Sequence, residues 1–155
     1  MTAERKTDVY GDIEVQAAVL TRNFELLRRR RSEQLEVDRA EYLLLRTLDD
    51  LGPSTIGALA DSLGLDPSTV GRQVAVLEQS GWAVRVEDPG DRRRTIVETT
   101  SAGRAAMRRT SRERRRRTRQ MLGDWTEEDL RSLAEMFGRY NAAVARHHLG
   151  HEPQA

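Results

Sequence analysis

Apolar residues near the start of the chain recur every three or four positions, which is the spacing of one face of an α-helix. Between residues 11 and 31 this stripe consists of Ile13, Ala17, Leu20, Phe24 and Leu27. The pattern predicts an amphipathic helix over residues 11–31. Its apolar seam suits either the chain's own core or a helix of another subunit.

Two helices are expected next. The first begins at Asp38, whose carboxylate can accept the free N–H groups of a first helical turn, and runs to Asp50. The Gly-Pro pair at 52–53 stops it. A short helix then follows in segment 54–64, with Ser54 as its predicted N-cap.

A tight turn and a longer helix come after this short helix. Gly64 stands where the short helix should end. After about three residues, Asp66 and Pro67 form a strong helix start, because Asp caps the first turn and Pro loses nothing by lacking an N–H there. This longer helix is expected to continue to Gly81.

The remaining pattern predicts a β-hairpin and two more helices. Residues 82–86 and 95–100 alternate as strands do, and the charged loop 87–94 joins them. A long helix is expected over residues 101–122 and a last one over residues 126–148. The fold class is therefore mainly α with a small β-hairpin wing.

A short helix, a tight turn, a longer helix and a hairpin, in this order, are typical of a winged helix-turn-helix. In that fold the longer helix lies in the major groove of DNA. Its outward polar residues are predicted to be Ser68, Thr69, Arg72 and Gln73. Their hydroxyl, guanidinium and amide groups suit phosphates, guanine edges and adenine edges. The alternative is that they are ordinary surface residues of a helix.

The hairpin tip, residues 88–94, is a second candidate DNA contact. It holds two aspartates and three arginines: Asp88, Asp91, Arg92, Arg93 and Arg94. Carboxylates that hold the turn would allow an arginine to enter a minor groove. The alternative is a solvated loop with local salt bridges.

Composition narrows the function further. The chain has 155 residues, of which 37% are hydrophobic and 33% charged, so we expect one domain with a thin helical core that a partner subunit completes. It has no cysteine, which excludes disulfides and thiolate chemistry. No segment resembles an export signal or a membrane span, and a cytoplasmic location is expected. The net charge of +1 does not by itself argue for nucleic acid.

Residues 35–104 resemble the DNA-binding core of MarR-family regulators. The most specific part is the D-x-R pattern within DPGDRRR, followed by TSAG. The resemblance implies that Asp91 braces the wing and that Arg93 reaches DNA. It also implies that the flanking helices build a homodimer interface. The expected organisation is a single domain, 1–155, with a DNA-binding lobe at 35–104 and a dimerisation region at 11–31 plus 105–148.

The same resemblance implies a small aromatic or anionic effector in a cleft between the dimerisation helices and the DNA-binding lobe. Candidate lining residues are Phe24, Arg28, Arg39, Tyr42 and Met107. The alternative is that Phe24 and Tyr42 belong to the core.

Other features point away from further chemistry. The arginine run at 108–120 is interpreted as solvated or ion-paired, and the alternatives are contact with DNA phosphates or pairing with acidic residues across a dimer. His147, His148 and His151 are interpreted as solvated side chains, with a transition-metal site as the alternative. No catalytic motif is present, so we expect neither an enzyme nor a cofactor. The chain is predicted to be a ligand-responsive repressor that binds a pseudo-palindromic operator as a homodimer. The alternatives are a winged-helix protein-interaction module and a non-specific architectural DNA-binding protein.

Overall fold

The computed structural model describes residues 8–29 and 36–149, which belong to two units divided after Leu35. The first unit contributes helix α1 (Val9–Arg29), which begins where Asp8 accepts a hydrogen bond from the backbone N–H of Gly11 at 3.1 Å. This agrees with the predicted helix from residue 11, whose last residues lie outside the described part. The apolar stripe of α1 is open, since Ile13 is 51% exposed and Phe24 39%.

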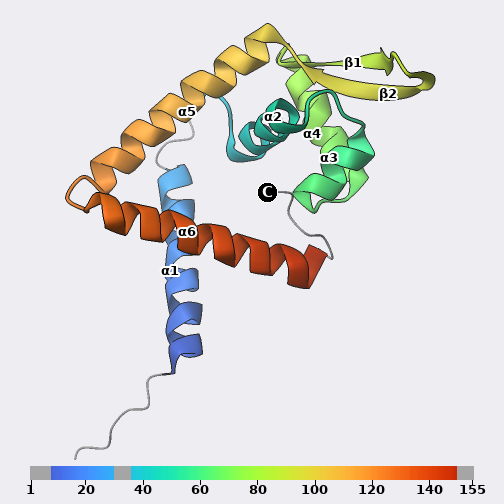
Figure 1. Ribbon diagram of the computed structural model, residues 1–155. Coiled ribbons are helices and arrows are strands. Elements are labelled where there is room, and N and C mark those ends of the chain that lie inside the picture. Colours follow the sequence, from blue (N-terminus) through green and yellow to red (C-terminus); the bar gives the residue numbers. More distant parts are fainter. Residues whose placement is uncertain (1–7, 30–35, 150–155) are drawn as a thin grey trace, which may run out of the picture. The chain divides into compact units, whose positions relative to one another are not determined.

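The second unit begins with three helices that pack around one core, as Figure 1 shows: α2 (Arg39–Leu51), α3 (Ile56–Leu63) and α4 (Pro67–Gln79). Asp38 caps α2 as predicted. Its Oδ1 accepts the Glu41 N–H at 2.8 Å, and its own N–H donates to Glu41 Oε2 at 2.8 Å. These two bonds satisfy backbone groups that an uncapped helix would leave free.

The predicted N-cap of α3 is wrong by one residue. Thr55, not Ser54, accepts the N–H of Ala58, at 3.2 Å. Ser54 instead forms an isolated β-bridge with Val97, in which each backbone N–H donates to the other residue's carbonyl, at 3.1 and 2.8 Å. The bridge ties the segment before α3 to the hairpin, so the backbone of Ser54 is held by Val97 and does not cap α3.

The turn between α3 and α4 follows the predicted chemistry. Gly64 ends α3 with a φ of 64°, a left-handed conformation that glycine adopts without a Cβ clash. Asp66 caps α4 and Pro67 occupies its first position. Helix α4 ends at Gln79, two residues before the predicted Gly81.

The hairpin consists of β1 (Ala83–Asp88) and β2 (Asp91–Thr99), paired antiparallel in a two-stranded sheet. It is longer than predicted. Asp88 pairs with Asp91 across the turn, so Arg92, Arg93 and Arg94 lie within β2 rather than in a loop. The predicted charged loop 87–94 is therefore mostly strand. It carries no apolar alternation because the side chains on both faces of this part of the ribbon are exposed, and no strand pattern is therefore visible in the sequence here.

The hydrophobic core lies among α2, α3, α4, the base of the hairpin and the first half of α5 (Ser101–Met121). Its fully buried side chains include Leu44, Leu45, Leu59, Val70, Val74, Leu77 and Val97. The core thus holds α4 against the lobe along one face only.

The long helix α5 starts directly at the base of the hairpin. Thr100 caps it, donates its hydroxyl to the Gly81 carbonyl at 2.7 Å and donates its N–H to the Trp82 carbonyl at 3.0 Å. Gly103, one turn into α5, lies so close to Trp82 that an added Cβ would meet the Trp82 carbonyl oxygen at 2.1 Å. Only glycine fits at this joint.

Helix α6 (Glu127–Val144) follows after a short turn and continues as a π-helical turn, Ala145–Leu149. Thr126 and Asp129 form a capping box at its start. No residue of α6 is buried, although the helix carries the apolar residues Leu130, Leu133, Phe137, Tyr140 and Val144 at helical spacing. Among the described residues, no helix is long and apolar enough to cross a membrane.

Candidate nucleic-acid interface

Helix α4 divides into a buried face and an open face. Val70, Val74 and Leu77 have no exposed surface and fix the helix to the core. On the other side Ser68 and Arg72 are exposed, and Thr69 and Gln73 are half-buried. The structure therefore brings the four predicted reading residues together on one element, as the helical spacing implied.

The hydroxyl groups at the start of α4 are engaged within the chain. The carboxylate of Asp66 accepts hydrogen bonds from the Ser68 and Thr69 hydroxyls and from the Thr69 N–H. These bonds hold the pKa of the Asp66 carboxyl well below its ordinary value, the Ser68 hydroxyl being the largest cause. In this state both hydroxyl protons point to Asp66, and a phosphate oxygen could receive one only after that hydroxyl rotates.

Arg72 keeps most of its hydrogen-bonding capacity. Its Nη2 donates to the Thr69 hydroxyl oxygen at 3.1 Å, which uses one of five guanidinium N–H groups. The rest of the group remains free to contact a guanine edge or a phosphate. At the neighbouring Gly71, an added Cβ would meet only Ile56 Cδ1, at 3.9 Å, so packing within the chain does not require glycine there.

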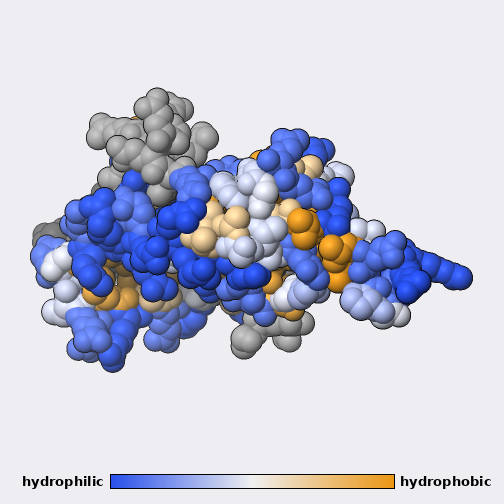
Figure 2. Space-filling model, turned by 90° about the horizontal axis from the view of Figure 1, so that it is seen from above, coloured by the Kyte–Doolittle hydropathy of each residue, from blue (hydrophilic) through white to orange (hydrophobic). Residues whose placement is uncertain are grey.

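The wing turn is held by its two aspartates. Asp88 Oδ1 accepts the Gly90 N–H at 2.9 Å, and Asp91 Oδ1 accepts the Arg93 N–H at 3.0 Å. The three arginines at 92–94 are exposed, and none forms an ion pair within the described residues. The carboxylates thus shape the backbone and leave the guanidinium groups free. Figure 2 shows the hairpin projecting at the right, with a hydrophilic surface toward its tip.

One side chain joins the hairpin to α4. Arg85 of β1 places Nη1 3.2 Å from Glu78 Oε2 and donates from Nη2 to the Gly71 carbonyl at 3.4 Å. Neither Arg85 nor this contact was singled out from the sequence. A basic residue at an alternating strand position gives no sign of its partner until the hairpin is folded onto the helix.

The predicted effector residues lie in different surroundings. Met107 is 4% exposed and belongs to the core, while Arg39 is exposed at the start of α2. Tyr42 is half-buried beneath the guanidinium of Arg114, whose Cζ is 4.4 Å from the ring centroid. Phe24 belongs to the first unit, and the side chain of Arg28 lies outside the described part, so nothing places these two beside Tyr42.

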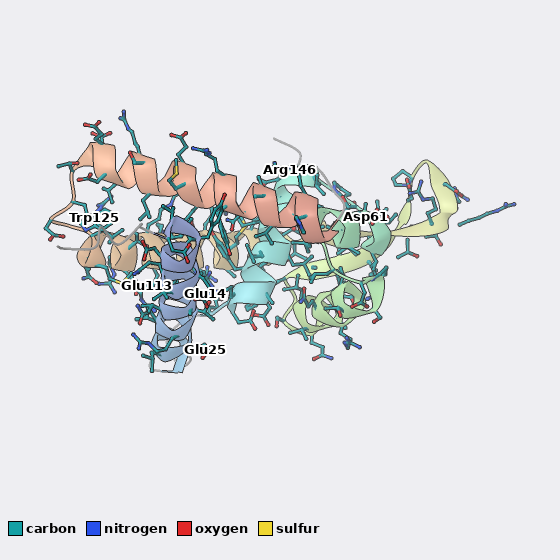
Figure 3. The ribbon with its side chains drawn as sticks, turned by 90° about the horizontal axis from the view of Figure 1, so that it is seen from below. Glu14, Glu25, Asp61, Glu113, Trp125 and Arg146 are labelled. Atoms are coloured by element: carbon teal, nitrogen blue, oxygen red, sulfur yellow. The ribbon has the colours of Figure 1, made fainter. Side chains whose placement is uncertain are left out.

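A cavity of about 570 Å³ opens beside Tyr42. It is lined by residues of α2, the second half of α5, the following turn and α6: Tyr42, Arg46, Ser111, Arg114, Arg115, Thr118, Arg119, Leu122, Gly123, Trp125 and Leu130. Trp125 lies at the turn between α5 and α6 (Figure 3). The cavity combines aromatic rings with several cations.

Arg114 is the most unusual of these cations. Its Nη2 donates to the Asp38 carbonyl at 3.2 Å, but its Nε is buried and has no hydrogen-bond partner among the described residues. Burial lowers the pKa of its guanidinium, and the nearby charge of Arg39 acts in the same direction. The group has a ring and a carbonyl beside it but no carboxylate in an ion pair among the described residues, an arrangement that favours a bound anion.

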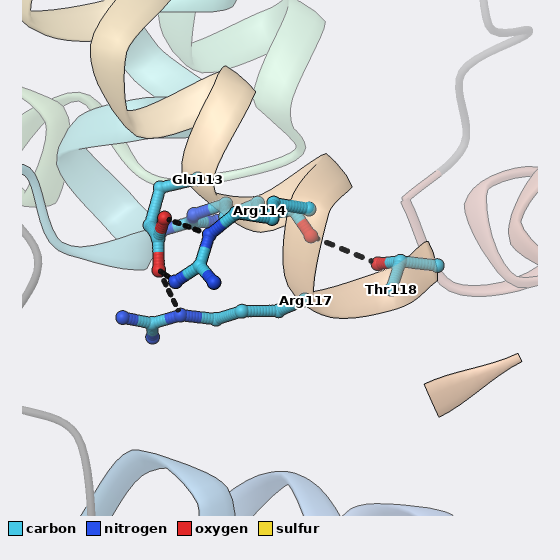
Figure 4. Close-up of polar contacts among 5 residues, drawn as sticks. Glu113, Arg114, Arg117 and Thr118 are labelled. Carbon is cyan, nitrogen blue, oxygen red and sulfur yellow. Dashed lines mark hydrogen bonds and ion pairs between the residues drawn. The ribbon is translucent and has the colours of Figure 1, made fainter. Parts of the chain in front are cut away.

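The other arginines of α5 are paired or solvated. Glu113 accepts hydrogen bonds from Arg116 and Arg117, and Figure 4 shows the Arg117 contact, at 2.6 Å. The hydrogen bonds from these two arginines lower the pKa of Glu113 to about 2. Within the run at 108–120, the exposed arginines without an ion pair to a described residue are Arg108, Arg112, Arg115 and Arg119. Some arginines of this run are therefore ion-paired and others are exposed to solvent, as interpreted from the sequence.

The C-terminal histidines add no metal site that can be described. Among the described residues, no group of three or more histidine, cysteine, aspartate or glutamate side chains could hold a metal ion. The side chain of His148 and all of His151 lie outside the described part.

Comparison with known proteins agrees with this geometry. The model of the MarR family matches residues 37–95. The chain is 36% identical over 107 residues to YxaD of Bacillus subtilis, an uncharacterised HTH-type transcriptional regulator, covering 69% of this chain and 75% of YxaD. A MarR family protein of Bacillus stearothermophilus has the same fold, with a TM-score of 0.72 at 17% identity over 94% of this chain and 99% of that one.

A further similar structure is that of PcaV, a transcriptional regulator of Streptomyces coelicolor, solved in complex with its natural ligand. Its TM-score is 0.68 at 23% identity, covering 93% of this chain and 99% of that one. These likenesses agree with a mainly helical fold that carries a two-stranded wing.

Proposed function

This chain belongs to the MarR family of transcriptional regulators, and from that premise we propose that it binds a pseudo-palindromic operator as a homodimer and releases it when an effector binds. Helix α4 lies in the major groove in this proposal, and the wing contacts the flanking minor groove. The protein then acts on DNA in the cytoplasm as a regulator, not as an enzyme.

The observation that carries the proposal is the two-sided character of α4. One face is fully buried through Val70, Val74 and Leu77, while Arg72 and its polar neighbours stay open. Within the part of the chain that the structure describes, the three wing arginines form no ion pair, and they lie on the same lobe. A helix held by its core face, with free donors outward, is the arrangement that base readout requires.

Helix α6 supports the homodimer. An 18-residue helix with a regular apolar stripe and no buried residue leaves that stripe in water unless a second chain covers it. Two copies related by a two-fold axis would present their α4 helices about 34 Å apart, one turn of DNA. The operator would then be an inverted repeat.

The cavity beside Tyr42 supports an effector site. Its cations and aromatic rings suit an aromatic anion, and the orphaned Nε of Arg114 offers a donor to it. Of the residues named from the sequence for this role, Tyr42 lines the cavity. A ligand that favours a dimer with a spacing mismatched to DNA would weaken operator binding.

The DNA part is tested by selecting duplexes from the parent genome with the purified protein and measuring their affinities. Arg72→Ala and Arg93→Ala should each weaken the selected duplex roughly tenfold, as loss of one specific contact does. Arg112→Ala, at an exposed arginine of α5, is the control and should leave affinity unchanged. Equal affinity of all four proteins would refute the assigned docking.

Two other functions give different results in the same experiment. A protein-interaction module would select no duplex and show a shallow dependence on salt. An architectural protein would bind every duplex equally, without enrichment of an inverted repeat.

The effector part is tested with benzoate as an aromatic carboxylate probe. It should raise the melting temperature of the wild-type protein and weaken its binding to the selected duplex. Arg114→Gln should abolish both responses, whereas Arg112→Gln should retain them. Retained responses in Arg114→Gln would place the anion elsewhere.

A further inference from the structure

The contact between Arg85 and α4 has a geometry that a simple surface ion pair does not need. Arg85 lies in β1, opposite Val97 of β2, and its guanidinium reaches two points of α4: the Glu78 carboxylate at 3.2 Å and the Gly71 carbonyl at 3.4 Å. Within the described residues, no other hairpin side chain forms a hydrogen bond or ion pair to α4.

The two points of contact lie along one line of the helix. Gly71 and Glu78 are seven residues apart, which is nearly two turns, so they share a face and stand about 10.5 Å apart along the axis. Side chains on a helix lean toward its N-terminus, which brings the Glu78 carboxylate back toward Gly71. A planar guanidinium held at both points resists sliding along the helix and swivelling about it.

Stability alone does not explain this arrangement. The side chains of Arg85 and Glu78 are 37% and 29% exposed, and ion pairs with this much solvent contribute little to the free energy of unfolding. Among the described residues, the hairpin is a two-stranded ribbon. Where Val97 pairs with Arg85, the Ser54 bridge ties the β2 side and the Arg85 contact with α4 ties the β1 side. A two-stranded ribbon is weakly held on its own, and this second tie would limit its motion against α4.

We propose that Arg85 is a positioning residue that fixes the offset between the reading face of α4 and the arginines of the wing. This role rests on the proposed DNA-binding function. The offset that Arg85 fixes sets the distance between the major-groove contact of α4 and the minor-groove contact of the wing. It thereby sets how many base pairs separate these two contacts within one half-site. Arg85 acts through α4 and the hairpin and need not touch DNA itself.

The test uses the full-length protein and a duplex that the wild-type protein selects from a random-sequence pool. Affinity is measured for this duplex and for a scrambled duplex of the same composition, and hydroxyl-radical footprints report groove protection. The variants are Arg85→Ala, Arg85→Lys and Glu78→Gln. Arg116→Ala is the matched control, because Arg116 is 60% exposed and pairs with Glu113 at 2.8 Å on α5.

We expect Arg85→Ala to weaken the selected duplex about tenfold and the scrambled duplex less than about threefold, with unchanged melting temperature. Protection of the flanking minor groove should fade while protection under α4 remains. Lysine keeps the charge but cannot hold both points, so Arg85→Lys should behave like Arg85→Ala. Glu78→Gln should also lower the ratio of the two affinities, and Arg116→Ala should not.

Contrary results are equally clear. If Arg85→Ala weakens both duplexes equally and Glu78→Gln leaves their ratio unchanged, Arg85 is a phosphate contact and the positioning role is wrong. If the wild-type protein selects a duplex that Arg85→Ala binds equally well, the role fails alone. If the wild-type protein selects nothing, the proposed function fails with it.

Discussion

Arg109 and Glu36 form a two-pronged ion pair, with Nε 2.9 Å from Oε2 and Nη2 2.7 Å from Oε1, across 73 residues of sequence. It joins α5 to Glu36, which lies three residues before the first residue of α2. Five residues further along α5, Arg114 donates to the Asp38 carbonyl at 3.2 Å. Two arginines of one helix therefore grip the beginning of the DNA-binding lobe.

The Arg109–Glu36 pair should make stability depend on pH. The hydrogen bond from Arg109 lowers the pKa of the Glu36 carboxyl. The ionised carboxylate therefore stabilises the fold fully at pH values above the ordinary glutamate pKa. That contribution disappears as pH falls through the lowered value. Glu36→Gln should lower the urea midpoint slightly at pH 7, and the difference should shrink below about pH 4. Glu135→Gln, at an exposed position of α6, should change neither midpoint; a pH-independent effect of Glu36→Gln would contradict the ion pair's role.

Gly103→Ala should destabilise the protein strongly. The new Cβ would lie 2.1 Å from the Trp82 carbonyl oxygen, which is backbone and cannot rotate away. We expect a loss of about 1–3 kcal/mol in the free energy of unfolding, measured by urea denaturation. Gly138→Ala on α6 is the matched control: nothing lies within 4 Å of its added Cβ, and the change should stabilise by about 1 kcal/mol. Similar values for both variants would mean that the joint at Trp82 is looser than described.

Asp91→Ala should weaken operator binding although it removes a negative charge. The Asp91 carboxylate holds the Arg93 N–H at 3.0 Å, and without it the wing turn loses one of its two braces. A loss of roughly fivefold is expected from one such hydrogen bond. Asp91→Asn keeps the acceptor oxygen and should bind nearly as the wild type does. Tighter binding by Asp91→Ala in a gel-shift titration would show that charge repulsion outweighs the brace.

Phe137→Arg should separate the proposed dimer. Phe137 lies in the middle of the uncovered stripe of α6, where a charge would be desolvated by a second chain. Size-exclusion chromatography with light scattering should show a monomer, and operator affinity should fall with it. Glu135→Arg, on the opposite side of the same helix, should remain dimeric. A dimeric Phe137→Arg protein would place the interface on other residues.

Local chemistry made several helix boundaries predictable. The N-caps Asp38, Asp66 and Thr126 each bond to a backbone group three residues along, a relationship contained in a short stretch of sequence. Ser54 was misassigned because its partner, Val97, is 43 positions away. The N-terminal residues of a helix can be read locally, whereas a β-bridge depends on how distant segments fold together.

The candidate site divides in the same way. The open face of α4 followed from helical periodicity, and the aspartate brace of the wing followed from the D-x-R resemblance. The cavity could not be predicted from the sequence, because it joins Tyr42 to residues of α5 and α6 some 70 to 90 positions later. The extension of β2 through Arg92–Arg94 was missed because an exposed two-stranded ribbon carries no hydrophobic alternation.

The glycine joint at the start of α5 has a mechanical consequence. Gly103 packs directly against the backbone of Trp82, and Thr100 forms two hydrogen bonds beside this contact, so α5 is held closely against the base of the wing. Twenty-one residues of helix make a rod about 31 Å long, and a tilt of 5° moves its far end by roughly 3 Å. If the joint stays rigid, a displacement of roughly 3 Å at the distant end of α5 would correspond to a turn of about 5° at the base of the hairpin.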